Sequence, residues 1–283
     1  MSRVMARVPA PARTGASSGE LAVIDLGSNT ARLVLFSTTP EGGFHTLYSE
    51  KELPRLGHGT GPDGAIASEG LERGVGTLRR FAHRIDRLGR PPTIAVATSA
   101  VREAPNRDSF LNQVRRSTGL RLEVLTGEQE GRYAYLGTGS AWELNQDLLL
   151  DLGGGSLQLA STRQGRLRRV SSVPLGALRL AEKFLEHDPP REREMEALRR
   201  HARAVLRPVL ARVGLPHRVF GIGGSVRALA RVAIARRQYP IPQVHGYALR
   251  RRELRELVRS LAQMNIDRRK AVPGLSRPRA EVV

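Results

Sequence analysis

Apolar residues along this chain recur in short runs that end at an aspartate, pass through a small polar or glycine-rich turn and then resume. Residues 21–36 have this pattern, and residues 148–160 repeat it. Sliding one stretch onto the other places Asp25 on Asp151 and Gly27 on Gly153. A strand that ends at a tight turn and is followed by a second strand is typical of a buried β-hairpin. The repeat therefore predicts a duplicated domain whose two turns face one cleft.

The remaining apolar pattern alternates between strand and helix periods, which is typical of an α/β protein. Further strands are predicted at 43–53, 93–97, 120–125 and 165–174, and in the run that ends at Gly221. Helices are predicted at 68–88, 107–118, 128–136, 175–186, 190–213, 226–236 and 250–264, followed by an irregular tail. We expect a disordered leader at 1–19 and two domains, 20–143 and 144–283.

The predicted turns have the composition of phosphate-binding loops. Glycine lets backbone N–H groups approach an anion without interference from a Cβ atom. For either hairpin alone, an ordinary glycine-rich turn is the alternative, and a solvated surface arginine is the alternative for Arg55. The predicted phosphate-binding residues are Asp25, Gly27, Ser28, Asn29, Thr30, Arg32, Arg55, Thr98, Ser99, Gly153, Gly154, Gly155, Ser156, Gly223, Gly224 and Ser225.

Three charged residues are candidates for the chemistry itself. Arg102 follows a predicted buried strand, where α/β proteins usually bind ligands, and its planar guanidinium suits an anion. Glu130 lies in a predicted first helical turn, where an acid either complements the helix dipole or projects into the cleft as a general base. Asp151 ends a strand beside the second turn, where a carboxylate holds a cation or a water.

The charge narrows the choice of ligand. The chain has 46 Lys and Arg against 27 Asp and Glu, a net charge of +19, which attracts polyanions unless it merely reflects coding bias. Aromatic residues make up 4%, too few for extensive base stacking, so nucleic acid is not the expected partner. A phosphate polymer or a highly phosphorylated small molecule fits better. The chain has no cysteine and no long apolar run, so we expect a cytoplasmic protein with no membrane partner.

In this order, eight motifs resemble the exopolyphosphatase/guanosine pentaphosphate phosphatase family of the actin-like ATPase superfamily. They are DLGSNTARL (25–33), ATSAVREAPN (97–106), TGEQEGRYAYLG (126–137), LDLGGGSLQL (150–159), SVPLGALRL (172–180), GIGGSVRALA (221–230), HGYAL (245–249) and VPGLSRPRAEVV (272–283). The resemblance implies two ribonuclease-H-like domains with mixed sheets flanked by helices and an interdomain cleft.

The resemblance also implies an activity, a cofactor and residue roles. The family releases a terminal orthophosphate with water, usually with Mg²⁺. By position, Glu130 matches the family's catalytic base, Arg102 a phosphate-binding arginine and Asp151 a metal-linked aspartate. The implied substrate is inorganic polyphosphate, with guanosine pentaphosphate, a nucleotide of the stringent response, as the alternative. A homodimer is a further expectation.

Two departures from the family pattern keep other functions open. Gln158 stands where the family usually has Glu, so we place it beside Asp151 as a weaker metal ligand. The chain also ends where the family generally continues into further helices. Both features are compatible with a catalytically weak polyphosphate or nucleotide sensor, whereas Glu130 and Arg102 favour an enzyme. An actin-like sugar or acetate kinase is disfavoured, because no sugar-binding loop is evident.

Overall fold

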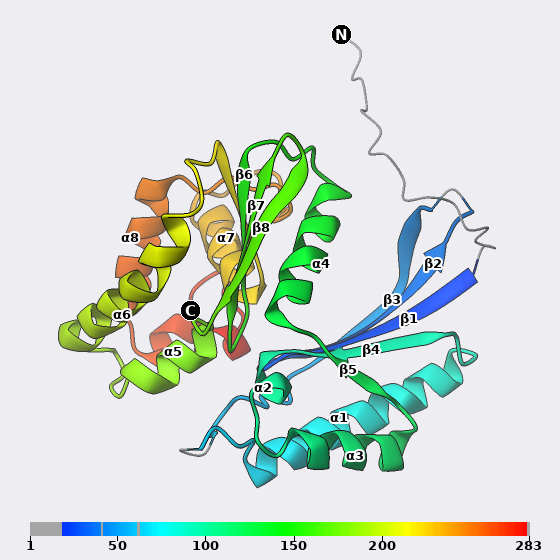
Figure 1. The fold of residues 1–283 in the computed structure, drawn as a ribbon. Coiled ribbons are helices and arrows are strands. Elements are labelled where there is room, and N and C mark those ends of the chain that lie inside the picture. The colour runs from blue at the N-terminus through cyan, green and yellow to red at the C-terminus, as the bar shows by residue number, and fades with distance from the viewer. Residues whose placement is uncertain (1–18, 41, 61–62, 282–283) are drawn as a thin grey trace. The chain divides into compact units, whose positions relative to one another are not determined.

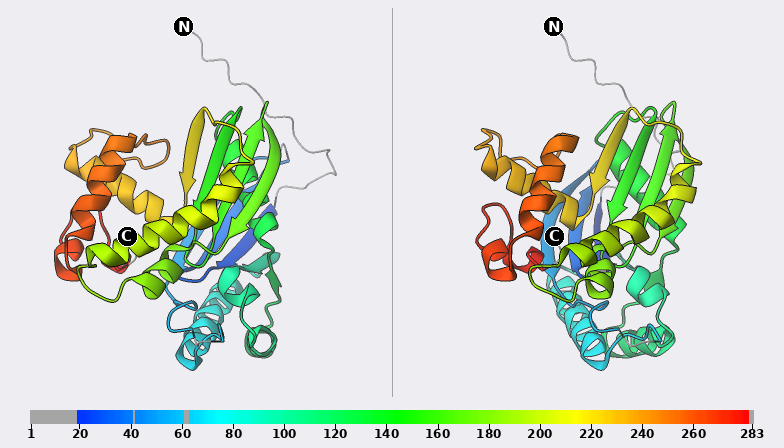
Figure 2. Two further views of the ribbon diagram at one scale, coloured as in Figure 1. Left: turned by 60° about the vertical axis from the view of Figure 1, so that its left-hand side comes forward. Right: turned by 90° about the vertical axis from the view of Figure 1, so that its left-hand side faces the viewer.

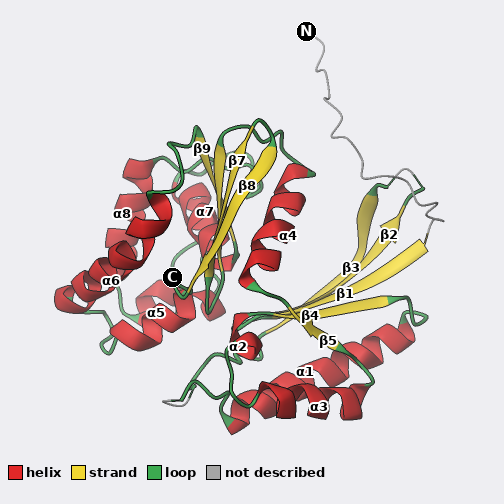
Figure 3. Cartoon of the chain, in the orientation of Figure 1, coloured by secondary structure: helices red, strands yellow, loops and turns green. Residues whose placement is uncertain are grey.

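The computed structural model describes residues 19–40, 42–60 and 63–281. The chain divides into two compact units, Met1–Leu144 and Asn145–Val283 (Figure 1). Each unit is an α/β structure with one sheet and several helices (Figure 3). The expected leader lies outside the described residues except for Gly19, which instead begins the first strand. No helix in the described part of the chain is long and apolar enough to cross a membrane.

The first unit contains a five-stranded mixed sheet in the order β3-β2-β1-β4-β5. Its strands are β1 (Gly19–Leu26), β2 (Ala31–Thr38), β3 (Phe44–Glu52), β4 (Thr93–Ala97) and β5 (Leu122–Val124). Its helices are α1 (Ser68–Arg87), α2 (Ser99–Arg102), α3 (Arg107–Thr118) and α4 (Gly127–Gly139). Apolar side chains of β1, β2, β4, α1 and α3 form one core, in which Phe81 and Phe110 are fully buried.

The second unit contains a four-stranded mixed sheet in the order β8-β7-β6-β9. Its strands are β6 (Asp147–Leu152), β7 (Leu157–Arg163), β8 (Arg166–Val173) and β9 (Arg218–Ile222). Its helices are α5 (Ala177–Phe184), α6 (Glu192–Leu210), α7 (Gly224–Arg236), α8 (Arg251–Ala262) and α9 (Ile266–Lys270), followed by a 3₁₀ turn, η1 (Arg277–Arg279). Helix α6 runs along one face of this sheet (Figure 2) and packs against Leu157 and Leu159.

The predicted duplication is confirmed in the strand order and in the turn geometry. In each unit the first three strands form an antiparallel meander, and the next strand pairs parallel with the first. The Gly27 N–H donates to the Thr30 carbonyl at 2.8 Å, and the Gly153 N–H donates to the Ser156 carbonyl at 3.0 Å. Both hairpins therefore close with the same four-residue turn.

Two local predictions were wrong, and one short helix was not predicted. The segment after residue 264 is not irregular, because it contains α9 and η1 and buries Leu275 and Ala280 against α7 and α8. Helix α7 begins at Gly224 rather than at residue 226, so the third glycine loop enters the helix directly. The polar segment after β4 folds into the short helix α2.

An ion pair between a buried aspartate and a half-exposed arginine fixes the start of the central strand of the second unit. The Asp147 carboxylate, whose side chain has no exposed area, accepts from Nε and Nη2 of Arg218 at 3.0 and 2.8 Å. It also accepts from the Asn145 N–H at 2.7 Å. The Arg218 guanidinium, helped by that N–H, holds the pKa of the Asp147 carboxyl below its usual value although burial opposes this shift. The pair ties β6 to β9 where both strands begin.

Candidate functional site

The first hairpin turn lies against the start of α2. The hydroxyl groups of Ser28 and Ser99 are buried and lie 2.9 Å apart, within hydrogen-bond distance. A Cβ atom on Gly27 would lie 3.9 Å from Oγ1 of Thr98. Four of the predicted phosphate-binding residues therefore form one cluster, which the end of β1 and the end of β4 bring together.

The following loop fixes the orientation of the peptide groups in this turn. The Gly57 N–H donates to the Ser28 carbonyl at 2.8 Å, and the Arg55 N–H donates to the Asn29 carbonyl at 3.3 Å. Arg55 has a positive φ of 51° and contributes its backbone to this arrangement. No hydrogen bond within the described chain occupies the N–H groups of Ser28 and Asn29. The turn thus has donors available for an anion.

Two predicted residues of the first hairpin lie outside this buried cluster. Asp25 and Arg32 face each other across β1 and β2, and both side chains are exposed. Thr30 is half-buried, and its carbonyl accepts the hydrogen bond that closes the turn.

Arg102 and Glu130, the two predicted catalytic residues, form an ion pair through Nη1 and Oε1. The same Nη1 donates to the Leu125 carbonyl at 2.8 Å, and Nη2 lies 3.7 Å from a carboxylate oxygen of Glu103. The side chains of Arg102 and Glu130 are 20% and 13% exposed. The structure therefore brings a potential proton acceptor next to a potential phosphate ligand.

A capping box positions Glu130. The Thr126 hydroxyl accepts from the Gln129 N–H at 3.2 Å, and the Gln129 side chain accepts from the Thr126 N–H at 2.7 Å. This reciprocal pair starts α4 at Gly127 and places Glu130 on its first turn. Arg102 comes from α2, so a cap and a short helix together set the distance between the two side chains.

The second hairpin turn is fixed from its carbonyl side by α5. The Gly153 carbonyl accepts from the Ala177 N–H at 3.0 Å, and the Gly154 carbonyl accepts from the N–H groups of Leu178 and Arg179 at 2.9 and 3.1 Å. Arg179 Nε donates to the Gly155 carbonyl at 2.8 Å. No hydrogen bond within the described residues occupies the N–H groups of Gly154 and Gly155. As in the first unit, the carbonyls of the turn accept hydrogen bonds from a neighbouring element, and the N–H groups are available to bind an anion.

Gly176 makes the close approach of α5 possible. A Cβ atom at this position would overlap the backbone of Gly154 and Gly155. The sequence showed Gly176 only as part of the SVPLGALRL motif (172–180). Its role depends on a contact with residues about twenty positions away, which local patterns do not reveal.

The third glycine loop lies against Asp151. Gly223 has a φ of 98°, and a Cβ atom there would lie 3.2 Å from Oδ1 of Asp151 and would overlap the Leu152 carbonyl. Gly224 begins α7, and Ser225 on its first turn is buried. The second unit therefore places the predicted cation ligand beside the predicted phosphate loop.

Arg279 is a functional candidate that the sequence did not single out. A Cβ atom on Gly224 would overlap its guanidinium, so Arg279 lies against the start of α7. Partial burial, together with the positive charges of Arg227 and Arg231, lowers the pKa of Arg279 below that of an ordinary arginine. Cations that gather at a helix N-terminus favour a bound anion. Arg279 lies in the VPGLSRPRAEVV motif (272–283), but the segment after residue 264 was predicted to be irregular, so nothing indicated that Arg279 lies at the start of a helix.

Gln158, the predicted weaker metal ligand, is buried in the sheet of the second unit. It lies opposite Asp151 across β6 and β7 and is 2% exposed. Its Nε2 donates to the hydroxyl of Ser156 at 2.8 Å and to that of Ser172 at 3.1 Å. The alternation of the strand did place Leu157 and Leu159 in the core. The opposite face is buried too, because Ser156 and Ala160 are almost fully covered.

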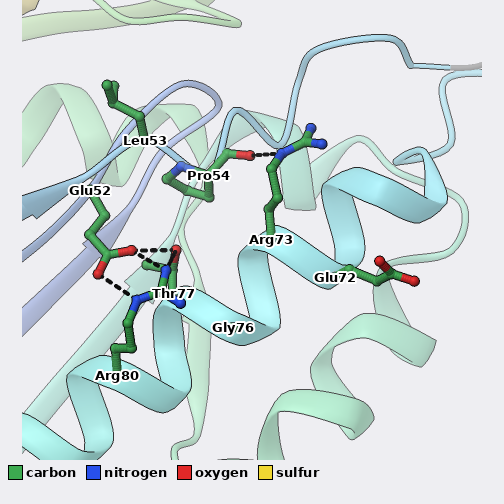
Figure 4. A pocket seen from close by; sticks show the side chains of 8 residues that line it. All are labelled: Glu52, Leu53, Pro54, Glu72, Arg73, Gly76, Thr77 and Arg80. Atoms are coloured by element: carbon green, nitrogen blue, oxygen red, sulfur yellow. Dashed lines mark hydrogen bonds and ion pairs between the residues drawn. The ribbon is translucent and has the colours of Figure 1, made fainter.

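A separate hollow in the first unit contains none of the predicted site residues (Figure 4). The Glu52 carboxylate, at the end of β3, binds Arg80 and accepts from the Thr77 hydroxyl at 2.9 Å. Arg73 Nε donates to the Pro54 carbonyl at 2.9 Å. These contacts attach β3 and the loop after it to α1. The Arg80 guanidinium and the Glu52 carboxylate are already hydrogen-bonded to each other.

Comparisons with known proteins identify the family and support the fold. A model of the Ppx/GppA phosphatase family matches residues 35–283. Exopolyphosphatase 1 of Mycobacterium tuberculosis is 33% identical over 265 residues, covering 92% of this chain and 77% of that protein. An exopolyphosphatase structure from Cytophaga hutchinsonii has a TM-score of 0.86 at 27% identity, covering 93% of this chain and 86% of that one. The Aquifex aeolicus Ppx/GppA structure has a TM-score of 0.76 at 28% identity, covering 94% and 86%. The chain is a member of the Ppx/GppA phosphatase family.

Proposed function

We propose that this chain is an exopolyphosphatase, which releases the terminal orthophosphate of inorganic polyphosphate with water. The observation that carries the proposal is the Arg102–Glu130 pair, which joins an anion ligand to a proton acceptor in a family of phosphatases. The relatives named exopolyphosphatase support polyphosphate as the substrate. The net charge of +19 also favours a polyanion.

In the proposed reaction, the oxygen of a water molecule attacks the terminal phosphorus. A new P–O bond forms, the P–O bond to the bridging oxygen breaks, and the shortened polyphosphate leaves with that oxygen. Glu130 orients the water and accepts its proton. Nη1 of Arg102 contacts Leu125 and Glu130, and Nη2 pairs loosely with Glu103 at 3.7 Å, so we assign the contact with phosphoryl oxygens to Nε and to Nη2 when Nη2 exchanges Glu103 for phosphate.

We assign the polyphosphate oxygens to the two hairpin turns and the third glycine loop. The available N–H groups of Ser28, Asn29, Gly154 and Gly155 suit phosphate oxygens. Arg279 adds a positive charge at the start of α7. Asp25 and Arg32 have exposed side-chain area, yet the surrounding protein raises the pKa of the Asp25 carboxyl by desolvation, and Arg32 opposes this shift; we assign both to contacts beside the first turn.

Mg²⁺ is the proposed cofactor, and Asp151 fits it. Its carboxylate supplies the hard oxygen that Mg²⁺ prefers, and it lies beside the third glycine loop, where phosphate oxygens would share the ion. The ion would neutralise charge on the phosphoryl group. Gln158 lies opposite Asp151 but uses Nε2 to hold two serine hydroxyls, so we give it a positioning role beside the metal site.

Guanosine pentaphosphate is the second candidate substrate, because the family name covers both activities and the same chemistry would cleave it. The high charge favours the longer polymer. A cytoplasmic location, suggested by the lack of cysteine, and a homodimer belong to the same proposal.

The decisive experiment measures phosphate release from long polyphosphate, short polyphosphate and guanosine pentaphosphate with Mg²⁺ present. We expect the highest kcat/KM with polyphosphate. A higher kcat/KM with guanosine pentaphosphate would assign the second function. Tight polyphosphate binding without release from any of the three would instead identify a sensor.

A further inference from the structure

A histidine and two glutamates meet at the junction of α5 and α6. A carboxylate oxygen of Glu186, a ring nitrogen of His187 and a carboxylate oxygen of Glu194 all lie within 4.8 Å of one another. Glu194 is buried, His187 is one-third exposed and Glu186 is exposed. None of the three belongs to the site proposed for phosphate release. We propose that this group binds one transition-metal ion of the zinc type.

The backbone already holds Glu194 in position. One of its oxygens, Oε2, accepts from the Arg191 N–H at 3.2 Å and from the His187 N–H at 3.4 Å. The other, Oε1, lies 2.5 Å from Nδ1 of His187. One oxygen of the carboxylate is therefore committed to the start of α6, and the other is directed at the imidazole. Such second contacts orient a ligand before the metal arrives.

The segment that carries His187 is fixed from its other side as well. The carboxylate of the next residue, Asp188, accepts from the Ile266 N–H at 2.6 Å and from Nη2 of Arg269 at 2.8 Å. Arg269 is itself buried. The α5–α6 junction is thus tied both to the start of α6 and to α9, so a metal would bind a constrained loop rather than order a free one.

The ligand types determine the class of metal. Imidazole nitrogen and carboxylate oxygens bind Zn²⁺ at about 2.0–2.2 Å in tetrahedral sites, which separates neighbouring ligand atoms by about 3.4 Å. The three ligand atoms, which all lie within 4.8 Å of one another, are close enough together to share one ion. Mg²⁺ and Ca²⁺ prefer oxygen ligands alone and make little use of imidazole. A water would complete the coordination, and the ion would join the segment that follows α5 to the first turn of α6.

The alternative is a purely structural ion pair in which Glu194 caps α6 and holds His187. The two readings differ in metal binding, so the test uses the untagged full chain after treatment with a chelator and dialysis. Zn²⁺ is titrated calorimetrically in the presence of excess Mg²⁺. We expect one tight site per chain and a higher Tm with Zn²⁺ than without it.

Two pairs of variants separate this site from adventitious binding. Glu186→Gln removes an exposed ligand without disturbing the cap, and His187→Gln removes the nitrogen. Each should weaken Zn²⁺ binding at least about tenfold and abolish the Tm increase. The matched controls are Glu192→Gln, an exposed acid on α6, and His83→Gln, an exposed histidine on α1, which should bind like the parent. No tight site in the parent, or an equal loss in the controls, would overturn the proposal.

Discussion

At the scale of single residues, the arrangement of Arg102 and Glu130 accounts for both charge and geometry at the proposed reaction centre. Arg102 ends α2, a helix of 4 residues, and Glu130 lies on the first turn of α4. Their ion pair holds each side chain in one orientation. A residue that must orient a water gains from such a restriction, because loose positioning is costly in catalysis.

Glu130→Gln tests the role of the carboxylate. The amide keeps the size of the side chain but does not accept the proton of the water, so we expect kcat to fall by about 10²–10⁴-fold. Polyphosphate affinity should change by no more than severalfold. Glu128→Gln is the control, because Glu128 is an exposed acid on the same first turn of α4. Activity of Glu130→Gln within threefold of the parent would exclude Glu130 as the base.

Gln158→Glu tests whether position 158 belongs to the metal site. A carboxylate there would be buried opposite Asp151, and two neighbouring negative charges repel each other. We expect a lower Tm than the parent without Mg²⁺ and a larger Tm increase when Mg²⁺ is added. Gln164→Glu, at an exposed turn, adds the same charge elsewhere. Equal Mg²⁺ responses in all three proteins would show that position 158 does not sense the ion.

Asp147→Asn tests the ion pair between the buried Asp147 carboxylate and Arg218. Loss of the carboxylate charge removes charge-assisted hydrogen bonds to Arg218, so we expect the free energy of unfolding at pH 7 to fall by about 2 kcal/mol. The folded pKa of Asp147 is lowered, so its contribution is present above the unfolded value of about 3.9 and is lost as pH falls through the folded value.

Urea unfolding of parent and Asp147→Asn at several pH values measures this contribution. The stability difference between the two proteins should shrink towards zero at strongly acidic pH. Asp267→Asn replaces an exposed acid and should match the parent throughout. A difference that is the same at every pH would mean that the carboxylate charge does not stabilise the fold.

At the scale of elements, α5 acts as the support of the second turn. Three of its N–H groups and the Arg179 side chain bind the carbonyls of the glycine loop. In the first unit the loop containing Arg55 and Gly57 has the same function without a helix. Two different elements therefore fix two equivalent turns.

Gly176→Ala should displace that support. Because the new methyl group would overlap the loop backbone, we expect a loss of about 1–3 kcal/mol in stability and an increase in KM for polyphosphate of at least tenfold. Gly137→Ala on α4 is the control, because a methyl group there meets no neighbour and the helix should gain up to about 1 kcal/mol. Unchanged Tm and KM in Gly176→Ala would contradict the close approach.

At the scale of the whole molecule, the sequence predicted most of the architecture and only part of the site. Apolar periodicity located the sheets, and the repeated Asp–turn pattern revealed the duplication, because both are local signals. Arg279, Gly176 and the folded segment around Leu275 were missed, because each depends on contacts between distant residues. The meeting of the two units' loops at one cleft stays a prediction.

The net charge of +19 leads to a prediction about salt. Arg251, Arg255 and Arg259 line an exposed groove on α8 and have no ion-pair partner among the described residues. Arg200, Arg203 and Arg207 are similarly exposed on α6. If the summed field attracts polyphosphate, the Kd should rise with salt.

Replacing either arginine triplet by Gln should then weaken polyphosphate binding by a similar factor and reduce its dependence on salt. Fluorescence anisotropy with labelled polyphosphate measures both quantities. Loss with the α8 triplet alone would indicate a local binding site on that helix. A Kd that does not change with salt would mean that the charge has no part in binding.

In both turns the backbone carbonyls accept hydrogen bonds from neighbouring elements, and this affects how the two halves of the protein could diverge after duplication. After a duplication, a binding site formed by side chains depends on those residue types. A binding site formed by peptide groups depends only on the backbone conformation. Ser28 and Asn29 in one copy correspond to Gly154 and Gly155 in the other, yet both turns close with the same hydrogen bond, and in both the N–H groups of these residues make no hydrogen bond within the described residues. Mutation could therefore change the residue types in each copy while the ability to hold an anion was inherited.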